Sequence, residues 1–63
     1  MTAPEQIATF TNPAYGVAAI VTRIKKGYAV TFLDTDAEAI IETRIYPQDM
    51  KAPAIAYAQT LTQ

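Results

Sequence analysis

Residues 17–33, with the sequence VAAIVTRIKKGYAVTFL, form the most informative segment of this chain. β-Branched and aromatic residues dominate both halves, as in β-strands, and Lys25-Lys26-Gly27 interrupts them. Gly27 can adopt the positive φ that a tight connection requires, which places Lys25 and Lys26 at the tip. The segment is therefore predicted to form a β-hairpin.

The residues after this hairpin continue the strand pattern. Asp34-Thr35-Asp36-Ala37 carries short polar side chains that can bond their own backbone, as in a turn. Residues 39–46 then return to β-branched residues, and Pro47 closes this strand. We therefore expect three antiparallel strands.

A helix is predicted after Pro47. Asp49 can act as its N-cap, with Pro53 at the end of the first turn and the C-terminus near Leu61. Alternatively, Ala52 is the cap and Pro53 the first helical residue. Helical spacing places one set of residues on a face that can lie across the sheet, with Tyr57 and Ile55 at its flanks: Met50, Ala54, Ala58 and Leu61.

The expected fold class is α+β, with the order β-β-β-α and the C-terminal helix packed on one face of a three-stranded antiparallel sheet. Residues 1–15 are interpreted as an N-terminal arm or edge strand, and residues 16–63 as a single small domain. Residues 7–11 are rich in β-branched and aromatic side chains, so they could add an edge strand, or they could remain a frayed tail.

Side-chain alternation assigns the faces of the strands. Glu42 and Arg44 should face water, which directs Ile41 and Ile45 towards the helix, together with Val30 and Phe32 of the preceding strand. The first strand allows two choices, with either Ile20 and Ile24 or Val17 and Val21 turned inward.

Length and composition predict a thin core. The chain has 63 residues and a formal net charge of -1. Hydrophobic residues make up 51% of it, but 12 of these hydrophobic residues are alanine. A domain this small buries only about 60% of its unfolded surface, so a partner or a second copy commonly covers the remainder.

The sequence contains no Cys, His, Ser or Trp, which excludes thiolate, imidazole and serine nucleophiles and zinc sites with nitrogen or sulfur ligands. Asp34, Asp36 and Glu38 alternate as the start of an EF-hand loop does, but Ala39 stands where that loop requires Gly and Ile45 where it requires Glu. We therefore expect no enzymatic activity, no metal and no cofactor.

Location is predicted from what the sequence lacks. The start has no basic segment followed by an apolar one, and the longest apolar run, residues 17–21, is far shorter than the roughly 20 residues of a membrane span. A chain without cysteine also suits a reducing compartment. We expect a cytoplasmic protein that does not enter a membrane.

Basic residues raise the possibility of nucleic-acid binding. Arg23, Lys25 and Lys26 cluster at the first hairpin, and Arg44 is expected on the exposed sheet face beside Tyr46, a possible stacking platform. In element order, residues 17–61 resemble the plant AP2-type domain and the amino-terminal arm-binding domain of some phage-type integrases. That resemblance implies a sheet placed in the DNA major groove, but those families carry more Arg and Lys on the sheet.

A protein partner is favoured over nucleic acid, because five cations cannot outweigh six anions at long range. The sheet face away from the helix is expected to carry Ala29, Leu33, Ile40 and Tyr46, with either Ala18 and Ile20 or Ala19 and Val21. The arm could cover part of it with Ile7, Phe10 and Tyr15, and exposed strand edges could pair with another copy.

Charge placement offers a further clue to self-association. Lys25 and Lys26 lie at one end of the hairpin, whereas Asp34, Asp36 and Glu38 lie at the other end of its second strand. Two copies could set the basic end of one against the acidic end of the other, or these charges could simply be solvated.

The hypothesis is a small non-enzymatic protein-interaction module, a homodimer joined through sheet edges or the uncovered face, acting as an adaptor or inhibitor of another protein. Its expected contact residues are Leu33, Ile40, Arg44 and Tyr46. The alternative is a nucleic-acid-binding module that uses Arg23, Lys25, Lys26 and Arg44.

Overall fold

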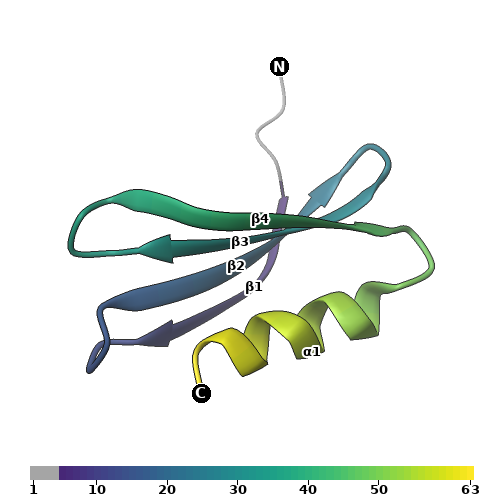
Figure 1. The fold of residues 1–63 in the computed structure, drawn as a ribbon. Helices are drawn as coiled ribbons and strands as arrows, with labels where there is room; N and C mark the ends of the chain where they lie inside the picture. The colour runs from purple at the N-terminus through teal and green to yellow at the C-terminus, as the bar shows by residue number, and fades with distance from the viewer. Residues whose placement is uncertain (1–4) are drawn as a thin grey trace.

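The computed structural model describes residues 5–63 and shows an antiparallel sheet with one helix along one of its faces (Figure 1). The strands follow one another across the sheet in chain order, each hydrogen-bonded to the next. The elements are β1 (Glu5–Asn12), β2 (Val17–Ile24), β3 (Gly27–Asp34), β4 (Ala39–Pro47) and α1 (Lys51–Leu61).

The expected α+β class is confirmed, but the sheet has four strands and not three. The extra strand, β1, is the edge strand that residues 7–11 were allowed to form, and it pairs with β2 from Glu5 to Asn12. Residues 1–4 of the expected arm lie outside the described residues. The arm does not cover the free face, because Ile7 and Phe10 pack on the helix side of the sheet and Tyr15 is exposed in the turn after β1.

The hairpin between β2 and β3 forms as predicted. Ile24 pairs with Gly27, so Lys25 and Lys26 are the two turn residues, and both are exposed. Gly27 has a φ of 151°, and a Cβ there would collide with the carbonyl oxygen of Tyr46 and the backbone of Pro47. Glycine is therefore required both by conformation and by the close approach of the end of β4.

The turn between β3 and β4 also bonds its own backbone as expected. Asp34 Oδ1 accepts hydrogen bonds from the N–H groups of Asp36 (3.0 Å) and Ala37 (3.1 Å). The Thr35 N–H donates to the carbonyl of Gly16 (2.8 Å), which joins this turn to the turn between β1 and β2. Both turns therefore lie at the same end of the sheet, opposite the β2–β3 hairpin.

The core lies between α1 and the sheet. Ala54 and Ala58 are fully buried, and their small side chains let the helix backbone approach the sheet closely. In β2 the inward residues are Ala19 and Val21, so the second of the two choices for this strand is correct. The buried cluster is completed by Tyr28 and Val30 of β3.

The predicted faces of β4 are wrong. Ile41 and Ile45 are 56% and 58% exposed, on the side away from the helix. Arg44 pairs with Val30 and Glu42 with Phe32, and directly paired residues share a face, so these charges lie on the helix side. This is tolerated because β4 is an edge strand, where water and the side chain of Tyr57 can both reach them.

The helix begins one residue later than predicted from Asp49. Met50 is the N-cap and makes no side-chain cap bond, and the N–H of Ala54 donates to its carbonyl at 3.1 Å. Asp49 cannot take this place because a turn from Pro47 to Met50, closed by a 3.0 Å bond, precedes the helix. Pro53 is the third helical residue, so the alternative start at Pro53 is wrong as well.

The helix ends at Leu61, as expected, and its inward face is also close to the prediction. Ala54, Ala58 and Leu61 face the sheet with Ile55 and Tyr57 beside them, whereas Met50 is 37% exposed and lies outside the core. Across residues 5–63, no helix has the length and apolar character needed to cross a membrane.

Candidate protein interface

The sheet face opposite α1 carries no other element of residues 5–63 (Figure 1). We call it the open face. Strand pairing assigns its residues, because directly paired residues point to the same side. They are Gln6, Thr9 and Thr11 of β1, Ala18, Ile20, Thr22 and Ile24 of β2, Ala29, Thr31 and Leu33 of β3, and Ile40, Ile41, Thr43 and Ile45 of β4.

The open face carries no charged residue, and eight of its fourteen residues are apolar. Six of its residues are Ile or Leu, and Ile40 is the most exposed of them at 69%. The charged residues of the four strands lie on the helix side or, for Asp34, at the turn between β3 and β4. They are Glu5, Arg23, Asp34, Glu42 and Arg44. A sheet face turned to water normally carries mainly polar and charged residues. An uncharged face with exposed Ile and Leu side chains is typical of a surface that contacts another protein.

A β-bulge enlarges the aliphatic part of this surface. Phe32 pairs with Glu42 but Leu33 pairs with Ile40, so Ile41 is an extra residue in β4. The shift in register turns both isoleucines to the open face, where both are more than half exposed. Sequence alternation grouped Ile41 correctly with Thr43 and Ile45, but assigned this group inward because Glu42 and Arg44 were expected to face water. The bulge adds Ile40 to the same face.

The four predicted contact residues fall on two different faces. Leu33 and Ile40 are paired with each other on the open face. Arg44 and Tyr46 lie on the helix side, where Arg44 Cζ sits 4.3 Å from the centre of the Tyr57 ring and the Tyr46 and Tyr57 ring centres are 6.2 Å apart. The predicted site is therefore split, and Ile41 and Ile45 join Leu33 and Ile40 in place of Arg44 and Tyr46.

Tyr57 connects α1 to the edge strand through polar contacts. Its hydroxyl donates to Glu42 Oε1 at 2.7 Å, and Arg44 Nε lies 3.7 Å from the same oxygen. The hydrogen bond to the Glu42 carboxylate is the main cause that raises the pKa of Tyr57 above its usual value. Glu42 and Arg44 thus contact each other and Tyr57 within the same chain.

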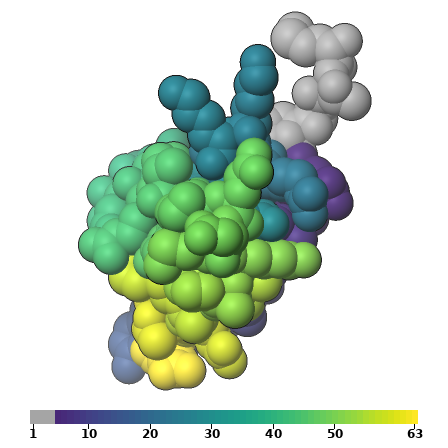
Figure 2. Space-filling model, turned by 90° about the vertical axis from the view of Figure 1, so that its right-hand side faces the viewer, coloured from purple at the N-terminus to yellow at the C-terminus, as the bar shows by residue number. Residues whose placement is uncertain are grey.

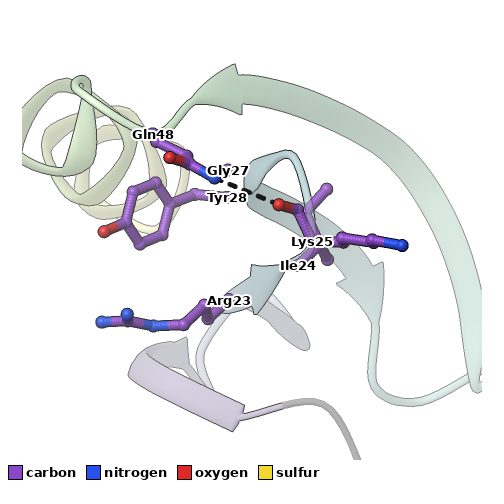
Figure 3. A pocket seen from close by; sticks show the side chains of 6 residues that line it. All are labelled: Arg23, Ile24, Lys25, Gly27, Tyr28 and Gln48. Atoms are coloured by element: carbon purple, nitrogen blue, oxygen red, sulfur yellow. Dashed lines mark hydrogen bonds between the residues drawn. The ribbon is translucent and has the colours of Figure 1, made fainter.

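The basic residues border a hollow at the hairpin end of the sheet. It has a volume of about 430 Å³ and is lined by Arg23, Ile24, Lys25, Gly27, Tyr28 and Gln48 (Figure 3). Gln48 Nε2 donates to the carbonyl of Lys25 at 3.2 Å, which joins the hairpin to the segment after β4. Figure 3 shows the Arg23 side chain beside Tyr28 and the Lys25 side chain directed the opposite way.

The predicted nucleic-acid residues come together only in part: Arg23 and Lys25 border this hollow, whereas Arg44 lies on the helix side of β4. Arg23 Nε lies 3.6 Å from Glu5 Oε2, and Arg23 Cζ lies 5.8 Å from the centre of the Tyr28 ring. Arg44 contacts the Tyr57 ring. Lys25 and Lys26 are exposed at the hairpin tip. Figure 2 views the molecule from the hairpin end and shows the side chains of this segment projecting from the surface. Within residues 5–63, no three acidic side chains are placed to hold a metal ion.

Comparisons with known proteins add no relatives: no family model, curated protein sequence or solved structure matches this chain.

Proposed function

We propose that the chain is a small, non-enzymatic protein-interaction module that self-associates into a homodimer through the open face of its sheet. One observation carries the proposal: six Ile and Leu side chains share a face that has no charged residue and no covering element in residues 5–63. Burying a single aliphatic side chain contributes about 1.5–3 kcal/mol, so covering this face would supply much of the stability that the thin core lacks.

Its role is that of an adaptor or inhibitor, in which the dimer presents its remaining surfaces to a further protein. The lack of His, Cys and Ser in the sequence supports a role without catalysis and without a cofactor. The cysteine-free composition suits a reducing compartment, so we place the module in the cytoplasm.

The test is sedimentation equilibrium of the unmodified chain and of Ile45→Lys over a wide range of protein concentrations. Ile45 is already 58% exposed in the monomer, so a lysine there leaves the fold intact but places an unpaired charge in the interface. We expect the unmodified chain to reach a dimer mass and Ile45→Lys to stay monomeric.

Ala56→Lys is the matched control. It adds the same charge at an exposed position of α1, on the other side of the molecule, where lysine is nearly as good a helix former as alanine. It should dimerise like the unmodified chain. A monomer at every concentration, or a dimer that Ile45→Lys leaves unchanged, contradicts the proposal.

Nucleic-acid binding through Arg23, Lys25, Lys26 and Arg44 is the second candidate. It is supported by the hollow that Arg23 and Lys25 border beside the Tyr28 ring. Fluorescence anisotropy with a labelled single strand tests it, since Lys25→Glu with Lys26→Glu should weaken binding and flatten its salt dependence. No binding at low salt removes this candidate.

A further inference from the structure

The open face lies between two ends of opposite charge. Lys25 and Lys26 form the tip of the β2–β3 hairpin, and Asp34, Asp36 and Glu38 occupy the turn between β3 and β4. The eight residues of β3 separate the two ends by about 25 Å at about 3.3 Å per residue. The chain therefore carries a positive and a negative end along its strand direction.

Two copies can stack their open faces about a two-fold axis that runs either along the strands or across them. An axis along the strands sets basic end on basic end and lays β4 of one copy over β1 of the other. An axis across the strands reverses the strand direction, so the basic end of each copy meets the acidic end of its partner, and β4 lies over β4 of the partner.

Charge favours the axis across the strands. In that arrangement the two lysines of each hairpin approach three carboxylates of the other copy, and the contact occurs twice. In the other arrangement, two pairs of lysines and two sets of three carboxylates would face each other, and like charges at an interface are costly.

The distribution of aliphatic residues favours the same axis independently. Ile40, Ile41 and Ile45 are all on β4, whereas β1 presents Gln6, Thr9 and Thr11 to the open face. With the axis across the strands, Ile45 of one copy lies over Ile40 and Ile41 of the other. With the axis along the strands, these isoleucines would cover the polar residues of β1.

The size of the face requires that nearly all of it be used. Four strands about 4.8 Å apart and about eight residues long, at about 3.3 Å per residue, cover about 500 Å². Two such faces bury about 1,000 Å², which is the lower limit for a specific interface. The axis must therefore pass close to the middle row of the sheet, which is Thr9, Ile20, Thr31 and Thr43.

We propose that the partner of the open face is a second copy stacked face to face about a two-fold axis across the strands, with each Lys25–Lys26 hairpin tip against the acidic turn of the other copy. This inference rests on the proposed self-association and adds its geometry. Thr43, on the middle row of β4, then lies opposite Thr43 of the second copy.

Crosslinking tests this geometry directly, because the sequence contains no cysteine. In Thr43→Cys, a bismaleimide that spans the about 10 Å between stacked sheets should join the two copies. Thr9→Cys mixed with Thr43→Cys is the control for the other axis, in which these two positions face each other. Efficient crosslinking of Thr43→Cys alone is expected, and crosslinking found only in the mixture overturns the proposal.

Charge reversal tests the contact between the ends. Lys25→Glu with Lys26→Glu should weaken the dimer about tenfold at low salt, as should Asp36→Lys with Glu38→Lys, because each change turns two attractive contacts into repulsive ones. All four changes in one chain should return the dissociation constant to near that of the unmodified chain. An axis along the strands predicts no loss of affinity in any of these variants, because ends of like charge face each other before and after each change.

The outcomes separate the two proposals. If the unmodified chain is a monomer, both the proposed function and this arrangement are overturned. If it is a dimer that Ile45→Lys disrupts, but charge reversal has no effect and Thr43→Cys does not crosslink, the open face is the interface and only the arrangement is wrong. A dimer that neither Ile45→Lys nor charge reversal disrupts uses a strand edge, which also overturns both.

Discussion

Glu38 is a non-glycine residue with a strained backbone conformation. Its φ is 53°, in the left-handed region, where a side chain with a Cβ is strained by about 1 kcal/mol or more. It is exposed and follows directly on the turn that Asp34 closes, so the tight return into β4 imposes this conformation. Glycine adopts it without strain.

We predict that Glu38→Gly raises the free energy of unfolding by up to about 1 kcal/mol. The strain energy that it removes from the folded state exceeds the free-energy cost of glycine's extra conformational entropy in the unfolded chain. Urea titration measures the change. Glu38→Ala is the control, because it removes the same charge and keeps the strain. If the glycine variant is no more stable than the alanine variant, strain at this position is not significant.

At the scale of the elements, α1 makes two kinds of contact with the sheet. Ala54 and Ala58 are fully buried against its centre, and Tyr57 reaches the edge strand through Glu42 and Arg44. The central contact is apolar and insensitive to pH, whereas the contact with β4 depends on a phenol proton. The helix is therefore held to β4 by an interaction that alkali can remove.

This contact predicts a loss of stability in alkali. The hydrogen bond to Glu42 raises the pKa of Tyr57 in the folded state above that of a free tyrosine, so between these two pKa values the folded state keeps a proton that the unfolded state has lost. The stabilisation is complete below about pH 10 and declines as the pH rises through the folded pKa. Urea midpoints measured from about pH 8 upwards should show an advantage over Tyr57→Phe that is constant below about pH 10 and declines above it. An advantage independent of pH would contradict this account of the bond.

At the scale of the whole molecule, the sheet has one covered face and one open face. The covered face depends mainly on small and medium residues at its centre, and among residues 5–63 the largest fully buried side chains are Val21 and Val30. More Ile and Leu side chains lie on the open face than in this buried cluster. Folding and association should therefore be coupled in this chain.

Coupling predicts that Tm depends on protein concentration. A hundredfold rise in concentration adds about 2.7 kcal/mol to the unfolding free energy of each dimer, which raises Tm by several degrees. Calorimetry or circular dichroism at two concentrations measures this. The Tm of Ile45→Lys should not change with concentration. A constant Tm for the unmodified chain would show that the open face contributes nothing to its stability.

Local features could be predicted from local residues. Gly27 marked the hairpin, Asp34 marked the next turn, and the small residues at Ala54 and Ala58 marked the inward side of the helix. In each case the cause lies within a few residues of the feature. Alternation also correctly placed Leu33 on the face away from the helix, and Ile40 lies there too, but because of the bulge.

Features that depend on distant residues were not predicted. Glu42 and Arg44 were assigned to water on the far face because charge was weighed without Tyr57, which lies on another element and supplies a partner. Ile41 and Ile45 were assigned to the core because they alternate with those charged residues, so the error about the charges reversed both faces of β4.

By itself, the sequence determined the β-strand pattern, the hairpin at Gly27, the C-terminal helix and the excess of aliphatic over charged residues in the strands, because these follow from backbone preferences and composition. Only the tertiary structure decided that β1 completes the sheet and that the charges of the strands lie on the helix side. The reason is physical: the face on which a side chain lies depends on register and on the neighbours that can bond to it, and both are set by residues far away in the chain.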